Sequence, residues 1–84
     1  MSDYKLFYIT CKNKVEANKI AYALVKKDLV ACANIIPNIK SYFKWNKKKI
    51  NIVNESILVG KTVKKNMNKI ITHVKKISSY ECPC

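Results

Sequence analysis

The chain has 84 residues, a net charge of +12 and a hydrophobic fraction of 49%. A chain of this length forms one domain at most, so residues 1–84 are treated as a single domain. It has no apolar run near the ~20 residues that a membrane-spanning helix requires. The apolar fraction exceeds what so small a monomer needs for its core, which favours burial of apolar surface against other copies.

The basic residues, 17 in number, are all lysine. Arginine makes the bidentate contacts to phosphate and guanine, so a sequence-specific nucleic-acid reader without it would be unusual. We therefore favour a solvated, lysine-biased surface and expect no specific nucleic-acid partner and no membrane partner. Contact with polyanions is the alternative, with non-specific binding as its commonest form.

The four cysteines, Cys11, Cys32, Cys82 and Cys84, are too few and too irregularly spaced to indicate a disulfide framework. The residues after Met1 alternate in short runs and lack the charged start and apolar block of a signal peptide. These features predict free thiols and a cytoplasmic location.

The first half of the chain predicts a strand followed by a helix. Residues 4–11 are rich in aromatic and β-branched side chains, which is typical of a strand. Asn13 precedes Glu16 by three residues, the spacing of a capping box at a helix start. Apolar residues at helical spacing then predict a helix over about 14–28.

A nearly continuous apolar run at residues 29–37 predicts a strand buried on both faces. Pro37 has no N–H to donate, so it should mark a bulge or bend. Strict alternation follows, with Ile39, Ser41, Phe43 and Trp45 on one side and Lys40, Tyr42 and Lys44 on the other. The polar residues 46–49 predict a hairpin tip.

A return strand is predicted over residues 50–53 and 56–61, with Thr62 as the cap of a second helix. That helix has an apolar stripe of Val63, Met67, Ile70, Ile71, Val74 and Ile77, and Ser78 and Ser79 end it. The order is strand, helix, strand, strand, helix. It predicts a ferredoxin-like α+β fold with an antiparallel sheet, a long hairpin between the second and third strands, and most of its last strand absent.

Several residues, in this order and spacing, resemble the CutA divalent-cation tolerance proteins. The resemblance spans residues 6–83. It is strongest in the block from Ala31 to Pro37 with Trp45 after it, and is supported by Thr10-Cys11, Glu16-Ala17, Ile20-Ala21, Leu24-Val25, Ser41, Glu55, Lys61-Thr62 and Tyr80-Glu81-Cys82-Pro83.

The resemblance implies a tight homotrimer in which long hairpins clasp neighbouring subunits. It implies a link to tolerance of copper and other divalent cations, and no enzymatic activity. We expect the interface between copies to include Pro37, Tyr42, Phe43, Trp45 and Tyr80. The alternative for the hairpin aromatics is a base-stacking platform beside lysines.

The chain departs from the family pattern in three places. Ser78-Ser79 stand where the family usually has His-Pro, which removes a metal ligand. Lys47 stands where the hairpin tip usually has glycine, so Asn46 or a longer turn should absorb the backbone strain. The family also continues beyond the last proline of this chain, so the edge of the first strand should be exposed.

Candidate metal ligands are Cys11, expected to be exposed at the mouth of the first strand, and the tail residues Glu81, Cys82 and Cys84. Two thiolates in a Cys-x-Cys pair suit Cu(I) or Zn(II), although a complete site needs three or four ligands. If the pair only begins a strand, it has no such role. Cys32 should pack in the core and should be far from Cys11, which excludes a disulfide between them.

The remaining residues point away from catalysis. His73 is the only histidine and is expected at the boundary of the second helix, where metal binding is the minor alternative. With five acidic residues and one histidine, general acid–base chemistry has little to use. We expect a non-enzymatic metal-tolerance trimer that binds a divalent cation or copper weakly, with no obligatory cofactor. The alternative is a small-ligand sensor like the PII signalling proteins, with ligand in the clefts between subunits.

Overall fold

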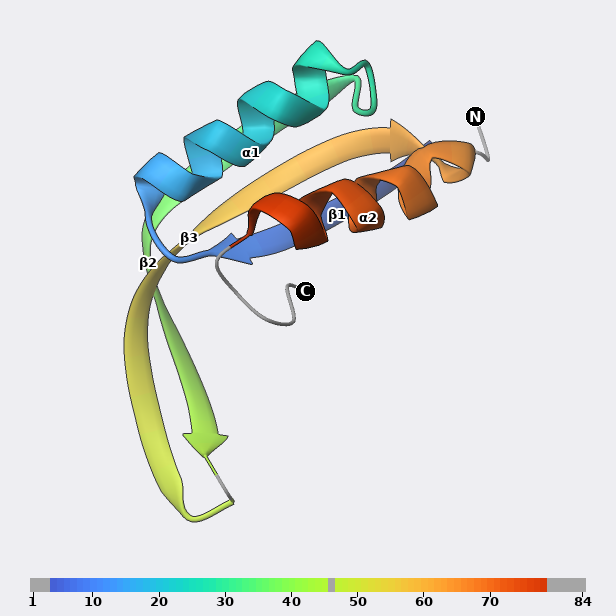
Figure 1. Ribbon diagram of the computed structural model, residues 1–84. Helices are drawn as coiled ribbons and strands as arrows, with labels where there is room; N and C mark the ends of the chain where they lie inside the picture. The colour runs from blue at the N-terminus through green and yellow to red at the C-terminus, as the bar shows by residue number, and fades with distance from the viewer. Residues whose placement is uncertain (1–3, 46, 79–84) are drawn as a thin grey trace.

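The computed structural model describes residues 4–45 and 47–78 of the chain. Two helices cover one face of a three-stranded antiparallel sheet in which the strand order is β1-β3-β2 (Figure 1). The elements are β1 (Tyr4–Cys11), α1 (Lys14–Lys26), β2 (Cys32–Trp45), β3 (Lys49–Val63), a 3-10 turn (Lys64–Asn66) and α2 (Met67–Ile77). The predicted α+β class, antiparallel sheet and long β2–β3 hairpin are confirmed.

Helix α1 begins and ends with local hydrogen bonds that the sequence encodes. The Asn13 side chain accepts a 2.9 Å bond from the Glu16 N–H, and the Glu16 carboxylate accepts one of 2.9 Å from the Lys12 N–H. At the other end, the N–H groups of Asp28 and Leu29 donate to carbonyls in the last turn, and Asp28 has a left-handed φ of 57°. The capping box is confirmed, while the helix ends at Lys26 because the chain turns left-handed at Asp28.

Strand β2 begins at Cys32, later than predicted, and only one of its faces is buried. Ala33 and Ile35 pack against the core, whereas Ile36 is 48% exposed. The prediction of burial on both faces is wrong for the single chain because both helices lie on the same side of the sheet. The bulge predicted at Pro37 is confirmed by a register shift between Ile36 and Ile39.

The hairpin between β2 and β3 contains Lys47 in the left-handed region, with φ of 60°. The strain was expected at Asn46 or in a longer turn, and Lys47 itself takes the left-handed conformation. A non-glycine residue in that region costs roughly 1 kcal/mol. Asn46 lies outside the described residues.

Strand β3 is continuous to Val63, so Thr62 does not cap the second helix. Its buried hydroxyl instead donates a 2.6 Å hydrogen bond to the carbonyl of Leu29, which also accepts a 3.3 Å bond from the Asn66 side chain. These two bonds join the loop after α1 to the turn before α2. The second helix consequently begins at Met67, after the 3-10 turn, and ends at Ile77 as predicted.

The core lies between the sheet and the two helices. Its buried residues are Ile9, Cys11, Ala17, Ile20, Leu24, Val30, Leu58, Ile70 and Val74. Gly60 pairs with Phe7 across β1 and β3, and a Cβ at residue 60 would lie 2.3 Å from the Phe7 ring. The glycine therefore makes room for the aromatic ring to lie over the sheet.

We predict that Gly60→Ala destabilises the protein by about 1–3 kcal/mol, because the added methyl group displaces the Phe7 ring. Where a methyl group meets no neighbour, Gly→Ala stabilises a protein, because it reduces the conformational entropy of the unfolded chain. A loss of stability here would therefore indicate a clash with Phe7. Urea unfolding at fixed protein concentration measures it. The double variant with Phe7→Leu should lose less than the sum of the single changes, and additive losses would contradict the contact.

Candidate functional site

Neither described helix covers one face of the sheet, which we call the outer face. Alternation along β3 turns Ser56, Leu58 and Thr62 toward the helices, where they are buried. The opposite residues form the outer face: Tyr4, Leu6, Tyr8, Cys32, Asn34, Ile36, Ile57, Val59 and Lys61. Leu6 is 73% exposed and Tyr8 57%. A contiguous apolar surface of this kind marks an interaction site.

The second surface is the arm, formed by residues 39–54 of the hairpin, which extends away from the helices (Figure 1). Tyr42 pairs with Ile52, and Ile50 lies on the same side of the ribbon. All three side chains are more than half exposed in the single chain. The arm thus carries apolar groups where neither helix can cover them.

The predicted interface residues divide between described and undescribed positions. Pro37, Tyr42 and Phe43 are exposed, as a contact with another copy would require. The side chain of Trp45 and all of Tyr80 lie outside the described residues. Their contact with a second copy therefore stays a prediction.

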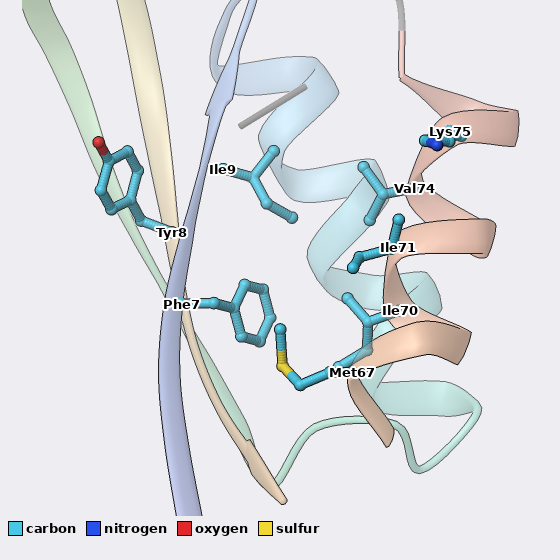
Figure 2. A pocket seen from close by; sticks show the side chains of 8 residues that line it. All are labelled: Phe7, Tyr8, Ile9, Met67, Ile70, Ile71, Val74 and Lys75. Atoms are coloured by element: carbon cyan, nitrogen blue, oxygen red, sulfur yellow. The ribbon is translucent and has the colours of Figure 1, made fainter. Parts of the chain in front are cut away.

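An apolar pocket of about 260 Å³ lies between β1 and α2 (Figure 2). Phe7 and Ile9 project into it from β1, facing Ile70, Ile71 and Val74 of α2. Tyr8, Met67 and Lys75 complete the lining. The Tyr8 side chain points away from the pocket, toward the outer face, so the Lys75 amine is the one titratable group among the lining side chains, and the pocket suits an apolar group (Figure 2).

Cys11 is fully buried, and the expectation that it would be exposed is wrong. It ends β1 on the helix side of the sheet, and its thiol donates a weak 3.8 Å hydrogen bond to the carbonyl of Ile9. Burial, followed by the charges of Glu16 and Glu55, raises the pKa of the thiol to about 11. The thiolate that binds metals is therefore disfavoured at neutral pH.

Cys32 is exposed on the outer face, contrary to the prediction that it packs in the core. The apolar run around it suggested two-sided burial, but β2 receives helices on one side only. Cys32 pairs with Lys61 in β3 and Cys11 pairs with Ser56, so the two cysteines lie at different positions along β3 and on opposite faces of the sheet. Both are free thiols, which confirms that they do not form a disulfide.

Within residues 4–45 and 47–78 no group of three or more His, Cys, Asp or Glu side chains could hold a metal ion. The proposed tail ligands Glu81, Cys82 and Cys84 lie outside the described residues. A metal site that includes them stays a prediction. No helix in the described part of the chain is long and apolar enough to cross a membrane.

A feature that the sequence interpretation missed is a basic groove of about 590 Å³ beside α2. It is lined by Lys27, Leu29, Asn68, Lys69, Thr72, His73 and Lys76. Residues 69, 72, 73 and 76 have the spacing of a single helix face, which was visible in the sequence. The approach of Lys27, from the end of α1, was not, because it depends on how the helices pack.

The molecule therefore belongs to the class of small α+β, ferredoxin-like domains with a projecting hairpin and an apolar outer sheet face. The family model of the CutA1 divalent ion tolerance protein matches residues 5–84. The chain belongs to this family.

Relatives by sequence carry the same name. The divalent-cation tolerance protein CutA of Archaeoglobus fulgidus is 38% identical over 81 residues, which are 96% of this chain and 78% of that protein. The CutA homolog of Xenopus laevis is 36% identical over 74 residues, covering 88% of this chain and 48% of its own length. The chain thus spans about half the length of the Xenopus protein.

Solved structures agree with the fold. CutA1 from Oryza sativa has a TM-score of 0.93 at 29% identity, with 98% of this chain and 74% of that chain covered. The structure described as the periplasmic divalent cation tolerance protein CutA of Archaeoglobus fulgidus has a TM-score of 0.89 at 37% identity, with 96% and 78% covered. The predicted ferredoxin-like fold and the resemblance to CutA proteins are confirmed.

We predict that Cys11 reacts slowly with a disulfide reagent such as 5,5′-dithiobis(2-nitrobenzoate). In a variant whose other three cysteines are serine, the native protein at pH 8 should react at least tenfold more slowly than in urea, because burial hinders access and the raised pKa depletes the thiolate. Free cysteine under both conditions is the control. Equal rates with and without urea would contradict a buried thiol.

Proposed function

We propose that this chain is the subunit of a cytoplasmic homotrimer that supports tolerance of divalent cations, copper among them, without catalysing a reaction. The observation that carries the proposal is the apolar surface of the outer face and arm, which no element in the described part of the chain covers. The metal-related role is supported by the names of the relatives.

The energy available for assembly comes from burying that apolar surface. Seven large apolar side chains on the outer face and arm are roughly half exposed or more: Tyr4, Leu6, Tyr8, Ile36, Tyr42, Ile50 and Ile52. Completing the burial of each contributes roughly half of the ~1.5–3 kcal/mol that full burial of such a side chain gives. Several together offset the roughly 4–15 kcal/mol that association costs in lost freedom.

The arm also favours a closed ring over a two-fold pair. It extends from one end of the sheet, while the outer face lies on a different part of the surface. If the arm of one copy contacts the face of the next, the two contacting patches differ, and such head-to-tail contacts form a ring when the rotation between copies closes. The number three rests on the resemblance to CutA proteins.

We predict that Leu6→Glu dissociates the assembly, because it places a charge in the centre of the proposed contact. Val15→Glu is the matched control, since Val15 is 75% exposed and lies on α1, whereas Leu6 is 73% exposed and lies on the outer face. Light scattering at micromolar concentration should give a trimer for the wild type and for Val15→Glu, and a smaller species for Leu6→Glu. A wild-type monomer would refute the trimer.

Metal binding is proposed at the tail residues Glu81, Cys82 and Cys84, because soft cations favour thiolates. Cys11 is a weaker candidate in the described structure, since its thiol would have to become accessible and lose its proton. A tail site needs further ligands, which other copies in a trimer would supply.

We predict that isothermal titration detects Cu(I) or Zn(II) binding that the double substitution Cys82→Ser, Cys84→Ser weakens at least tenfold, because it removes two soft ligands. Cys32→Ser is the control, since it removes an exposed thiol that the proposed site does not use. Affinity no tighter than millimolar, or unchanged in the double variant, would overturn the metal proposal. The assembly proposal has its own separate test.

A further inference from the structure

The basic groove lies on the helix side of the sheet, where the proposed assembly makes no contact. Helix α2 supplies Asn68, Lys69, Thr72, His73 and Lys76, and the end of α1 supplies Lys27 and Leu29. The α2 residues recur every three or four positions, so they share one helix face. The apolar face of α2, with Ile70 and Val74, is turned to the core and leaves this polar face to the groove.

The charge in the groove has a single sign. Lys27, Lys69 and Lys76 line it, all three side chains are exposed, and no acidic residue is among the lining residues. The adjacent acid in the sequence, Asp28, lines a neighbouring hollow that shares Leu29 with the groove. Clustered cations without acids repel one another, and an anion between them relieves that repulsion.

The lysines continue around the start of α2. Asn68 also lines a second hollow, whose other residues are Val63, Lys64 and Lys65. Five lysines, from α2, the turn before it and the segment after α1, therefore border one connected stretch of surface, with Asp28 in the next hollow.

His73 provides a second kind of observation. Its Nε2 atom is buried and has no hydrogen-bond partner among the described residues. A buried polar nitrogen without a partner carries a desolvation cost that a hydrogen bond would offset. His73 also lines the groove, so its imidazole lies beside the place where an anion would be held. Thr72 and Asn68 offer further donors on the same helix.

We propose that the basic groove is a binding site for an anion made of linked phosphate groups. The number of lysines favours a chain over a single phosphate. Lys69 and Lys76 are seven residues apart, which is about 10 Å along a helix that rises 1.5 Å per residue, and Lys27, Lys64 and Lys65 border the same stretch of surface. A single phosphate ion carries fewer charges than these five amines, whereas a run of linked phosphates carries more charge and spreads it along the surface. This inference goes beyond the proposed metal-tolerance role and does not depend on it.

The experiment is a titration of the full chain with inorganic tripolyphosphate at about 0.15 M salt, where exposed charges interact over only about 8 Å. His73 is the only histidine, so its imidazole signals in proton–nitrogen NMR spectra are unambiguous. They should shift and saturate with the same dissociation constant that calorimetry gives. Unchanged His73 signals at saturating tripolyphosphate would overturn the proposal.

A charge-matched pair of variants separates the groove from general attraction to a basic protein. The triple substitution Lys27→Gln, Lys69→Gln, Lys76→Gln should weaken binding at least tenfold. Lys12→Gln, Lys14→Gln, Lys19→Gln lowers the net charge of +12 by the same three units at the other end of α1 and should change binding less than threefold. Equal losses in the two variants would overturn the proposal. Circular dichroism confirms that both variants are folded.

Three further ligands define the chemistry. Adenosine triphosphate should bind with an affinity within tenfold of tripolyphosphate if the linked phosphates are what is recognised, whichever molecule supplies them. Binding of adenosine triphosphate without tripolyphosphate would overturn the proposal. Orthophosphate binding as tight as tripolyphosphate would do so as well, and so would tighter binding of a single-stranded RNA.

Discussion

The structure depends on the unbroken alternation of β3, the central strand that pairs with both of its neighbours. From Ser56 to Thr62 every second residue is turned to the helices and buried. The same alternation places Ile57 and Val59 on the outer face. Because both helices pack on one side, the strand that completes the core also leaves an apolar surface uncovered. The apolar surface on which the proposed assembly rests therefore follows from the way the core is built.

The surfaces of the molecule consequently differ in chemistry. The outer face and the arm are apolar and suit contact between copies, whereas the groove beside α2 is cationic and lies on the opposite side of the sheet. An assembly through the outer face would leave the groove open to small anions. The one described thiol in the core, Cys11, is protected by burial and by a raised pKa, so it serves packing more readily than metal chemistry.

The use of glycine shows how the turns are made with few flexible residues. The chain has a single glycine, and Gly60 lies where a Cβ would clash with Phe7. The described left-handed positions are instead occupied by Asp28, Asn38 and Lys47. Asp and Asn tolerate this conformation well, and Lys less so. The glycine is needed for packing in the sheet, while the turns contain non-glycine residues whose backbone is moderately strained in the left-handed region.

Local features were readable from the sequence because their causes are local. The first strand at residues 4–11, the capping box of Asn13 and Glu16, and the bulge at Pro37 depend on neighbours within a few residues. The family was also readable, since its motif is a short block of consecutive residues. Of the candidate site, the apolar character of the hairpin was predictable. The sequence wrongly predicted that Cys11 is exposed and Cys32 buried, and the structure shows the opposite.

The tertiary structure decided what depends on distant segments. Thr62 was predicted to cap a helix, but its hydroxyl donates a hydrogen bond to the carbonyl of Leu29, 33 positions away, and the residue lies in β3. Cys32 is exposed and Cys11 is buried because both helices pack on the same face of the sheet. The basic groove forms because Lys27 and Leu29, which follow α1, lie beside α2. The sequence by itself determined the elements, the turns and the family, because those follow from residue type and spacing. Which side chains are buried, and which face is free to bind, was decided by packing between segments far apart in the chain.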